Sequence, residues 1–227
     1  MDRHGLLRPV MLMNELQNVA DYHAEALGRG RTWCKENGCA WVVTHYLVDI
    51  DRMPGENQEI EISTWPSRAD ALRAARDFEI KDVKTGASMV RATSQWVMID
   101  MNTRKPVRID EVLADWGTLD ERVIDRPFEK FPEFEPATTW IAYPRFDDLD
   151  LNQHINNAVY ATWAAESLGF EFRDGHKLRR LDINFKKEIP ADVRNIEVES
   201  RLDGMTSRHM IKNEAEHANV ICEWSPL

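Results

Sequence analysis

The sequence predicts an α+β protein of two tandem units, each a long helix followed by antiparallel strands. The length of 227 residues suits two domains of about 110 residues each. The tripeptides Ala26-Leu27-Gly28 and Ser167-Leu168-Gly169 close two helical patterns. The segment 54–62, Pro-Gly-Glu-Asn-Gln-Glu-Ile-Glu-Ile, matches the segment 190–198, Pro-Ala-Asp-Val-Arg-Asn-Ile-Glu-Val. This internal similarity indicates a duplicated unit, and the two halves would pair their sheets edge to edge.

The first unit begins with a helix predicted over residues 8–27. Pro9 suits its first turn, where a missing N–H costs little. Apolar and small residues recur at spacings of three and four along one face: Leu12, Leu16, Val19, Ala20, His23 and Leu27. We expect His23 to be a satisfied core or rim histidine. Runs rich in β-branched and aromatic residues then predict four strands, over residues 40–50, 59–65, 72–83 and 87–101.

Residues 116–140 differ in character, with three prolines among alternating charges and phenylalanines. We expect a connection packed by Phe128, Phe131 and Phe134 rather than a disordered one. The second unit repeats the plan, with a short strand at 140–143, a helix at 156–168 and strands at 178–187, 195–202, 207–216 and 219–224. The predicted boundaries are 1–115 for the first unit, 116–137 for the linker and 138–227 for the second unit.

Composition narrows the class of protein. The chain is 43% hydrophobic and 30% charged, as in soluble globular proteins, and no apolar run approaches the roughly 20 residues of a membrane span. The net charge of −10 argues against nonspecific binding to nucleic acid. The N-terminus has no signal-peptide pattern. We interpret Cys34, Cys39 and Cys222 as reduced thiols of a cytoplasmic protein, and predict neither a metal site nor a cofactor.

Three polar residues of different chemistry, Asp150, Asn152 and His154, lie two positions apart just before the second predicted helix. In an extended segment they would share one face, while Leu151 and Ile155 would point into a core. A carboxylate that orients an imidazole, beside an amide that donates to a polarised oxygen, is an arrangement suited to hydrolysis. The triplet alone is weak evidence, because such triplets also occur on solvated loops.

The longer segment 148–167 reads Asp-Leu-Asp-Leu-Asn-Gln-His-Ile-Asn-Asn-x-x-Tyr-x-x-Trp-x-x-Glu-Ser. It closely resembles the signature of acyl-acyl carrier protein thioesterases, plant and bacterial enzymes with two fused hot-dog domains. Residues 12–28 are similar to the first helix of that family, and residues 92–106 to its strand that ends in a Thr-Arg turn. The resemblance covers nearly the whole chain. It implies a double hot-dog fold and hydrolysis of fatty acyl-acyl carrier protein (acyl-ACP) in fatty acid synthesis.

The resemblance places the active site in the second unit. Asp150, Asn152 and His154 match the family's Asp-x-Asn-x-His, and Glu188 matches its catalytic glutamate. Ile189 stands where plant members carry a cysteine that was a candidate nucleophile, so no cysteine acts there in this protein. The first half keeps no counterpart of the triplet. It is therefore expected to shape the acyl tunnel, with one active site per chain.

The resemblance also suggests a mechanism, as a hypothesis. Glu188 acts as general base on water, with direct attack by its carboxylate as the less favoured route. Asn152 positions the water or the carbonyl. His154 polarises the thioester or passes a proton to the leaving thiol, and Asp150 orients His154 or Asn152. Backbone N–H groups at the start of the helix near Asn156 hold the oxyanion.

Further residues are candidates for contact with the substrate: Asn156, Asn157, Tyr160, Trp163, Arg179 and Arg180. Acyl carrier proteins are acidic, so a docking surface on this acidic chain must be locally basic. The candidates are Lys177, Arg179, Arg180, Lys186 and Lys187, although an ordinary solvated strand face explains them equally well. Four residues are either acyl-chain lining or simply core: Met13, Leu16, Tyr160 and Trp163.

Two alternatives to an acyl-ACP thioesterase stay open. The protein could cleave acyl-CoA with the same residues, or it could be a non-catalytic hot-dog protein that binds an acyl thioester. The second alternative predicts a DNA-binding segment, which the sequence does not show.

A strand precedes the helix only in the second unit, so we expect a further strand before residues 2–5, without which the first unit has an unpaired edge. A monomer and a homodimer are both compatible with a double hot-dog.

Overall fold

The computed structural model describes residues 1–110, 112–113, 116, 118–119 and 121–227. Its helices are α1 (Pro9–Ala26), α2 (Arg31–Glu36), the 3-10 turn η1 (Phe146–Asp148), α3 (Asn157–Glu166) and α4 (Phe170–Gly175). The strands of the first unit are β1 (Cys39–Ile50), β2 (Ile60–Ala69), β3 (Arg73–Asp82) and β4 (Ser88–Asp100). Those that follow are β5 (Thr138–Ala142), β6 (His176–Phe185), β7 (Ile196–Asp203), β8 (Thr206–Lys212) and β9 (Glu216–Pro226).

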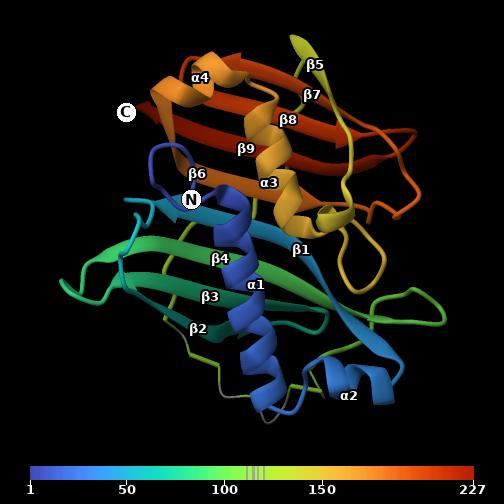
Figure 1. The fold of residues 1–227 in the computed structure, drawn as a ribbon. Coiled ribbons are helices and arrows are strands. Elements are labelled where there is room, and N and C mark those ends of the chain that lie inside the picture. Colours follow the sequence, from blue (N-terminus) through green and yellow to red (C-terminus); the bar gives the residue numbers. More distant parts are fainter. Residues whose placement is uncertain (111, 114–115, 117, 120) are drawn as a thin grey trace.

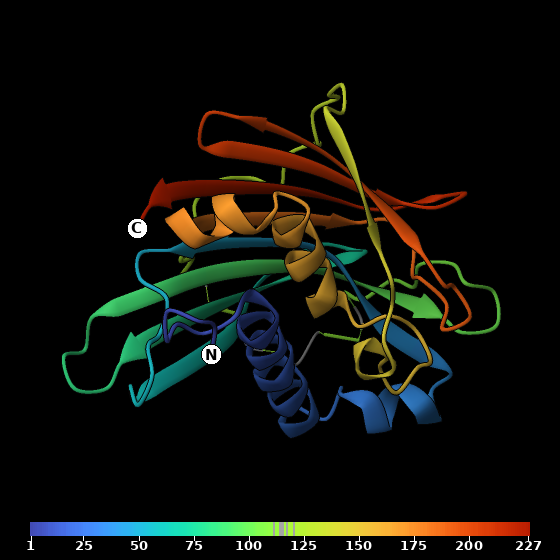
Figure 2. The same ribbon diagram turned by 45° about the horizontal axis from the view of Figure 1, so that its top comes forward.

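In the described residues the strands form one nine-stranded sheet in the order β2-β3-β4-β1-β6-β9-β8-β7-β5. The two halves join where β1 pairs with β6 in antiparallel register, from His45 opposite Asn184 to Asp49 opposite Arg180. This confirms the predicted edge-to-edge pairing. The sheet curves behind α1 and α3 (Figure 1), and both helices lie on the same face of it (Figure 2). The fold is therefore α+β, as predicted.

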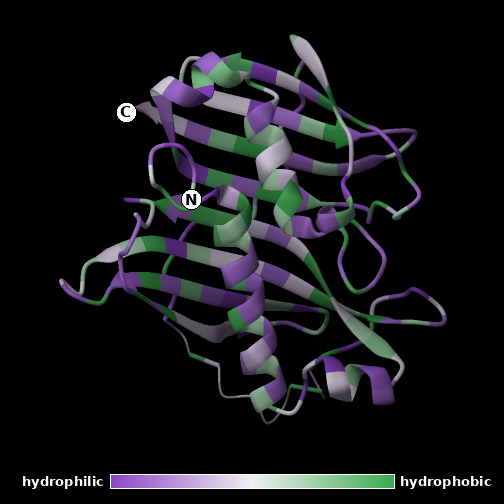
Figure 3. Ribbon diagram, in the orientation of Figure 1, coloured by the Kyte–Doolittle hydropathy of each residue, from purple (hydrophilic) through white to green (hydrophobic). Residues whose placement is uncertain are grey.

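The core lies between the two long helices and the sheet. Leu12, Leu16 and Ala20 of α1 are buried, and polar residues occupy the other side of that helix, so hydrophobic and hydrophilic bands alternate along it (Figure 3). On α3, seven of the ten residues are buried, four of them alanines, which let this helix approach the sheet closely. Leu27 does not belong to the buried stripe: it is 37% exposed because α1 ends at Ala26.

The long elements lie within a few residues of their predicted bounds. The predicted strand 207–216 is too long, because it ends at Lys212 and residues 213–215 form the turn into β9. In that turn Asn213 and Ala215 exchange two hydrogen bonds of 3.0 Å. The sequence analysis does not predict α2 or α4, since six residues are too few to show a helical period.

The linker packs through its phenylalanines, as predicted. The Phe128 ring lies 4.9 Å from the His45 ring, and the Phe131 and Phe134 rings are 5.9 Å apart, measured between centroids. His45 precedes Tyr46, which belongs to the core under the helices, so Phe128 lies on the opposite face of the sheet. Residues 117 and 120 of the predicted linker lie outside the described residues. The proposed unit boundaries stay a prediction.

The two units differ at the outer edges of the sheet. The second unit has β5 before its helix, and β5 pairs with β7. The equivalent of β7 in the first unit is β2, which forms an edge of the sheet in the described residues. In the part of the chain that is described, no helix combines the length and apolar character needed to cross a bilayer.

The three cysteines are free and buried, as expected for reduced thiols. Burial raises the pKa of the Cys34 thiol to about 12 and that of the Cys222 thiol to about 12. Because the thiolate is the reactive form, these side chains are chemically inert at neutral pH.

Candidate active site

The predicted triplet lies in a tight loop between η1 and α3, not in an extended segment. The N–H of Asp150 donates to the carbonyl of His154 at 2.8 Å, and the N–H of Gln153 donates to the carbonyl of Asp150 at 3.1 Å. Gln153 has a φ of +62°, a left-handed conformation that reverses the chain. The prediction for Leu151 is therefore wrong, because it is 82% exposed. Ile155 is 2% exposed and is part of the core, as predicted.

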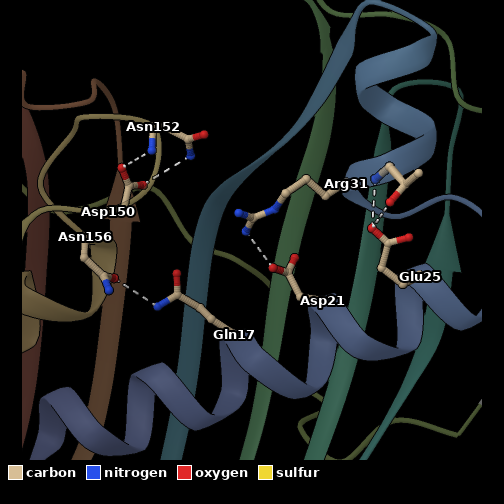
Figure 4. A network of polar contacts seen from close by, with 8 residues as sticks. Gln17, Asp21, Glu25, Arg31, Asp150, Asn152 and Asn156 are labelled. Atoms are coloured by element: carbon tan, nitrogen blue, oxygen red, sulfur yellow. Dashed lines mark hydrogen bonds and ion pairs between the residues drawn. The ribbon is translucent and has the colours of Figure 1, made fainter.

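The carboxylate of Asp150 braces this loop from within. Its Oδ1 accepts hydrogen bonds from the backbone N–H groups of Asn152 at 2.8 Å and His154 at 3.1 Å. Its Oδ2 accepts one from the side-chain amide of Asn152 at 3.3 Å (Figure 4). Asp150 thus orients the amide of Asn152 directly. It acts on His154 through the main chain.

Backbone pairing brings His154 to Glu188. Two hydrogen bonds of 2.9 and 3.1 Å join residues 153–155 to residues 189–191, just beyond the end of β6. Nδ1 of His154 then lies 3.5 Å from Oε2 of Glu188, and the two side chains are 30% and 41% exposed. Catalytic contacts are often this long before substrate binds. The arrangement gives an acid–base pair that water and substrate can reach.

Arg104, which the sequence analysis did not single out, also belongs to this site. Its Nη2 donates to Oε1 of Glu188. Arg104 belongs to the first unit. It lies close to Glu188 because β4 and β6 both pair antiparallel with β1 and therefore end at the same side of the sheet. The only signal in the sequence was the Thr-Arg turn that residues 92–106 share with the thioesterase family.

Asn156 caps α3 and ties it to α1. Its Oδ1 accepts the N–H of Ala158 at 2.9 Å and, at 3.4 Å, the side-chain amide of Gln17 (Figure 4). Its Nδ2 donates to Oδ1 of Asn14 at 3.0 Å. The polar atoms of Asn156, a predicted substrate contact, are thus already engaged within the protein.

The start of α3 offers fewer backbone donors than expected. The N–H of Asn156 donates to the carbonyl of Asp148 at 2.8 Å, and that of Val159 to the carbonyl of Asn156 at 2.9 Å. The N–H of Ala158 is held by the cap. These three groups cannot bind an oxyanion without breaking a bond. A backbone contribution is therefore limited to neighbours such as Asn157, the half-buried first residue of α3.

Tyr160 and Trp163 are buried, with 1% and 4% of their surface exposed. Burial raises the pKa of the Tyr160 hydroxyl, and the charges of Glu188 and Asp150 raise it further, so the group is neutral at physiological pH. Trp163 lines a cavity of about 650 Å³ between α3, α4 and the N-terminal loop. The residues that line this cavity do not include His154 or Glu188.

Arg179 and Arg180 do not join the acid–base pair. They are the fourth and fifth of the ten residues of β6, and Arg180 precedes Glu188 by eight residues of mostly extended chain, roughly 25 Å. Arg180 pairs with Glu223 at 2.7 Å, and Arg179 donates to the carbonyl of Asp51. A direct contact of either arginine with the reacting thioester is incompatible with this placement. A role in docking a larger partner stays a prediction.

A continuous antiparallel sheet that wraps two helices, one from each half, defines the class of double hot-dog proteins. Comparison with known families agrees with this architecture. The family model described as the acyl-ACP thioesterase N-terminal domain matches residues 1–116, and the model of the C-terminal domain matches residues 137–226. The chain belongs to the acyl-ACP thioesterase family.

Curated relatives include the chloroplastic acyl-[acyl-carrier-protein] hydrolase FATB1 of Cuphea viscosissima, 32% identical over 196 residues that cover 80% of this chain and 46% of that protein. The chloroplastic oleoyl-acyl carrier protein thioesterase 1 of Arabidopsis thaliana is 29% identical over 199 residues, 80% of this chain and 55% of that protein. The chain thus spans about half the length of the curated relatives it matches.

Solved structures share the whole fold. A putative oleoyl thioesterase from Lactobacillus plantarum superposes with a TM-score of 0.89 and 27% identity, covering 100% of this chain and 92% of that one. The 12:0-ACP thioesterase from Umbellularia californica gives a TM-score of 0.87 at 24% identity, covering 100% and 93%. The double hot-dog fold is therefore common to all three proteins.

Proposed function

We propose that this protein is a thiolester hydrolase that converts fatty acyl-ACP to free fatty acid and carrier protein, and so terminates or tunes fatty acid synthesis. The observation that carries the proposal is the pair formed by His154 and Glu188, whose Nδ1 and Oε2 atoms lie 3.5 Å apart beside the braced loop. The match of the chain to both domains of the thioesterase family supports it.

In the proposed reaction Glu188 accepts a proton from water as the water oxygen adds to the thioester carbonyl carbon. The tetrahedral intermediate then breaks its carbon–sulfur bond as His154 gives a proton to the departing sulfur. The proton that Glu188 took from water passes to Nδ1 of His154, so both side chains return to their starting states. Positioned acid–base groups of this kind typically contribute about 10²–10⁴-fold each to the rate. No cysteine acts as nucleophile at the position of the plant cysteine, because Ile189 occupies that position and is fully buried.

Asn152 supplies a donor in this scheme. A carboxamide has two N–H donors, and one is engaged with Oδ2 of Asp150 at 3.3 Å. The second can reach the attacking water or the carbonyl oxygen. Asp150 contributes by holding the loop in shape, since its contacts within the loop are to backbone N–H groups and to this amide.

We place the acyl chain in the first unit, between α1 and the sheet. A largely apolar pocket there is lined by Ala20 and Ala24 of α1 and by three tryptophans, Trp41, Trp96 and Trp116, and the charged residues Asp21 and Arg76 also contribute to its wall. Its volume of about 40 Å³ is far below the roughly 300–1,000 Å³ of pockets that hold drug-sized ligands. Side chains must therefore move apart before a fatty acyl chain can enter.

The test is hydrolysis of acyl-ACP and acyl-CoA substrates of matched chain length by the purified protein. The proposal predicts turnover of acyl-ACP with the higher kcat/KM. Equal or faster turnover of acyl-CoA would favour the acyl-CoA alternative. Tight binding of both substrates without turnover would contradict the hydrolase proposal and favour a non-catalytic acyl-binding protein.

A further inference from the structure

We infer that Arg104 is a positioning residue through which the first unit holds Glu188 ready for catalysis. The inference rests on the proposed hydrolase function, and it assigns to the first unit a role beyond shaping the acyl tunnel. It starts from the contact between Nη2 of Arg104 and Oε1 of Glu188, which joins residues 84 positions apart in the chain.

The turn that carries Arg104 is held firmly. Oδ1 of Asp100 accepts the N–H groups of Asn102 at 3.0 Å and Thr103 at 2.7 Å, and also the Thr103 hydroxyl at 3.0 Å. The N–H of Arg104 donates to the carbonyl of Asp100 at 2.8 Å. The hydrogen bonds from Thr103 lower the pKa of the Asp100 carboxyl, so it remains an acceptor at physiological pH. The backbone of Arg104, from which the guanidinium extends, is therefore held in place by the hydrogen bonds of the turn.

The backbone of Arg104 would suit glycine better than arginine. Its φ is +58°, in the left-handed region that L side chains rarely adopt. The contact that this side chain makes is with Glu188, across the boundary between the two units.

The carboxylate of Glu188 is held at both ends. Oε1 meets Arg104, and Oε2 lies 3.5 Å from Nδ1 of His154. With 41% of its side chain exposed, Glu188 has little packing to fix its rotamer. A misplacement of about 1 Å can cost roughly 100-fold in rate. Arg104 thus limits the carboxylate to positions facing His154, and the site is complete only when both units are docked.

Four single variants separate this role from general effects. Arg104→Met should lower kcat about tenfold or more, with KM nearly unchanged, because a misplaced base slows chemistry more than binding. Arg104→Gly should lose as much activity while its melting temperature stays equal or rises, since glycine fits the left-handed turn. Arg104→Lys should recover part of kcat. Lys105→Met, which removes an exposed cation from the same turn, should behave like the parent.

The decisive measurement is a double-mutant cycle with Glu188→Gln, followed in single-turnover assays of acyl-ACP hydrolysis. If Arg104 acts through Glu188, adding Arg104→Met to Glu188→Gln produces no further loss. Parent-like kcat in Arg104→Met, a raised KM at unchanged kcat, or fully additive losses would overturn the inference. Absence of hydrolysis by the parent protein would instead contradict the proposed function, and the inference with it.

Discussion

The loop that carries Asn152 and His154 is held in shape by hydrogen bonds that the Asp150 carboxylate accepts, two of them from main-chain N–H groups. The carboxylate of Asp150 reaches His154 through the backbone N–H of His154, at 3.1 Å, and reaches Asn152 through both the backbone N–H and the side-chain amide. Its contribution is therefore that of an acceptor that fixes the shape of the loop. The effect of its negative charge can be separated from its role as an acceptor by experiment, because asparagine keeps one acceptor oxygen and loses the charge.

We predict that Asp150→Asn keeps most of the turnover and that Asp150→Ala loses it at least about tenfold. The alanine variant also loses acceptors for two N–H groups, which should lower the free energy of unfolding by about 1–2 kcal/mol. Steady-state kinetics and urea unfolding of the two variants provide the check. If Asp150→Asn is as inactive as Asp150→Ala, the charge of the carboxylate is required, and the loop-shaping role is insufficient.

At the scale of elements, α3 is the helix on which the site depends, and its first turn is joined to α1. Asn156 accepts the N–H of Ala158 at 2.9 Å and donates to Asn14 at 3.0 Å. It therefore connects the capping of one helix with the packing of the two units. Because the loop with His154 ends at this cap, movement of α3 should also move the imidazole.

Substitution of the cap should measure this connection. Asn156→Ala is expected to lower the free energy of unfolding by about 1–2 kcal/mol through loss of the cap and of its amide contacts. Asn18→Ala, in an exposed position of α1, serves as the matched control and should change stability by less than about 0.5 kcal/mol. Equal unfolding midpoints for the two variants in urea would show that the cap carries no stability.

The sequence was a good guide to the long elements, because periodicity over ten or more residues is a strong signal. It also pointed to the pair that the structure brings together, His154 and Glu188. The extended interpretation of the triplet failed at Leu151, since nothing local reveals that Gln153 adopts a φ of +62°. Arg104 went unrecognised because its contact depends on which strands end at the same side of the sheet.

At the scale of the whole molecule, a buried polar network links α3 to the outer strands of the second unit. His209 on β8 is fully buried, and its ring nitrogens lie 2.8 Å from the hydroxyls of Ser200 and Ser207. The hydroxyl of Ser167, at the end of α3, lies 3.1 Å from the same ring. Burial lowers the pKa of His209 to about 3, so the imidazole is neutral in the folded protein at physiological pH.

This network predicts how stability depends on pH. An unfolded histidine binds its proton near pH 6.5 and the folded one only near pH 3, so the unfolded state binds more protons between these values. Stability is complete above about pH 6.5 and falls as pH drops toward 3, by up to about 1.4 kcal/mol per pH unit for this group. The charged form would lose its place in the buried network.

The check compares urea unfolding of the parent and of His209→Gln at several pH values from 7 to 4. Burial also lowers the pKa of His23 and His217, so both proteins lose stability in acid. The free energy of unfolding of His209→Gln should nevertheless depend less steeply on pH than that of the parent, by the uptake of about one proton. Parallel slopes would mean that His209 does not titrate with unfolding.

The central claim is that Glu188, held beside His154, is the base of a thioester hydrolase. The most direct measurement is kcat for acyl-ACP hydrolysis by Glu188→Gln, which keeps the size of the side chain and removes its basicity. The account predicts a loss of about 10²–10⁴-fold in kcat, with an unchanged melting temperature and a similar KM. A variant that turns over at the parent rate would contradict it.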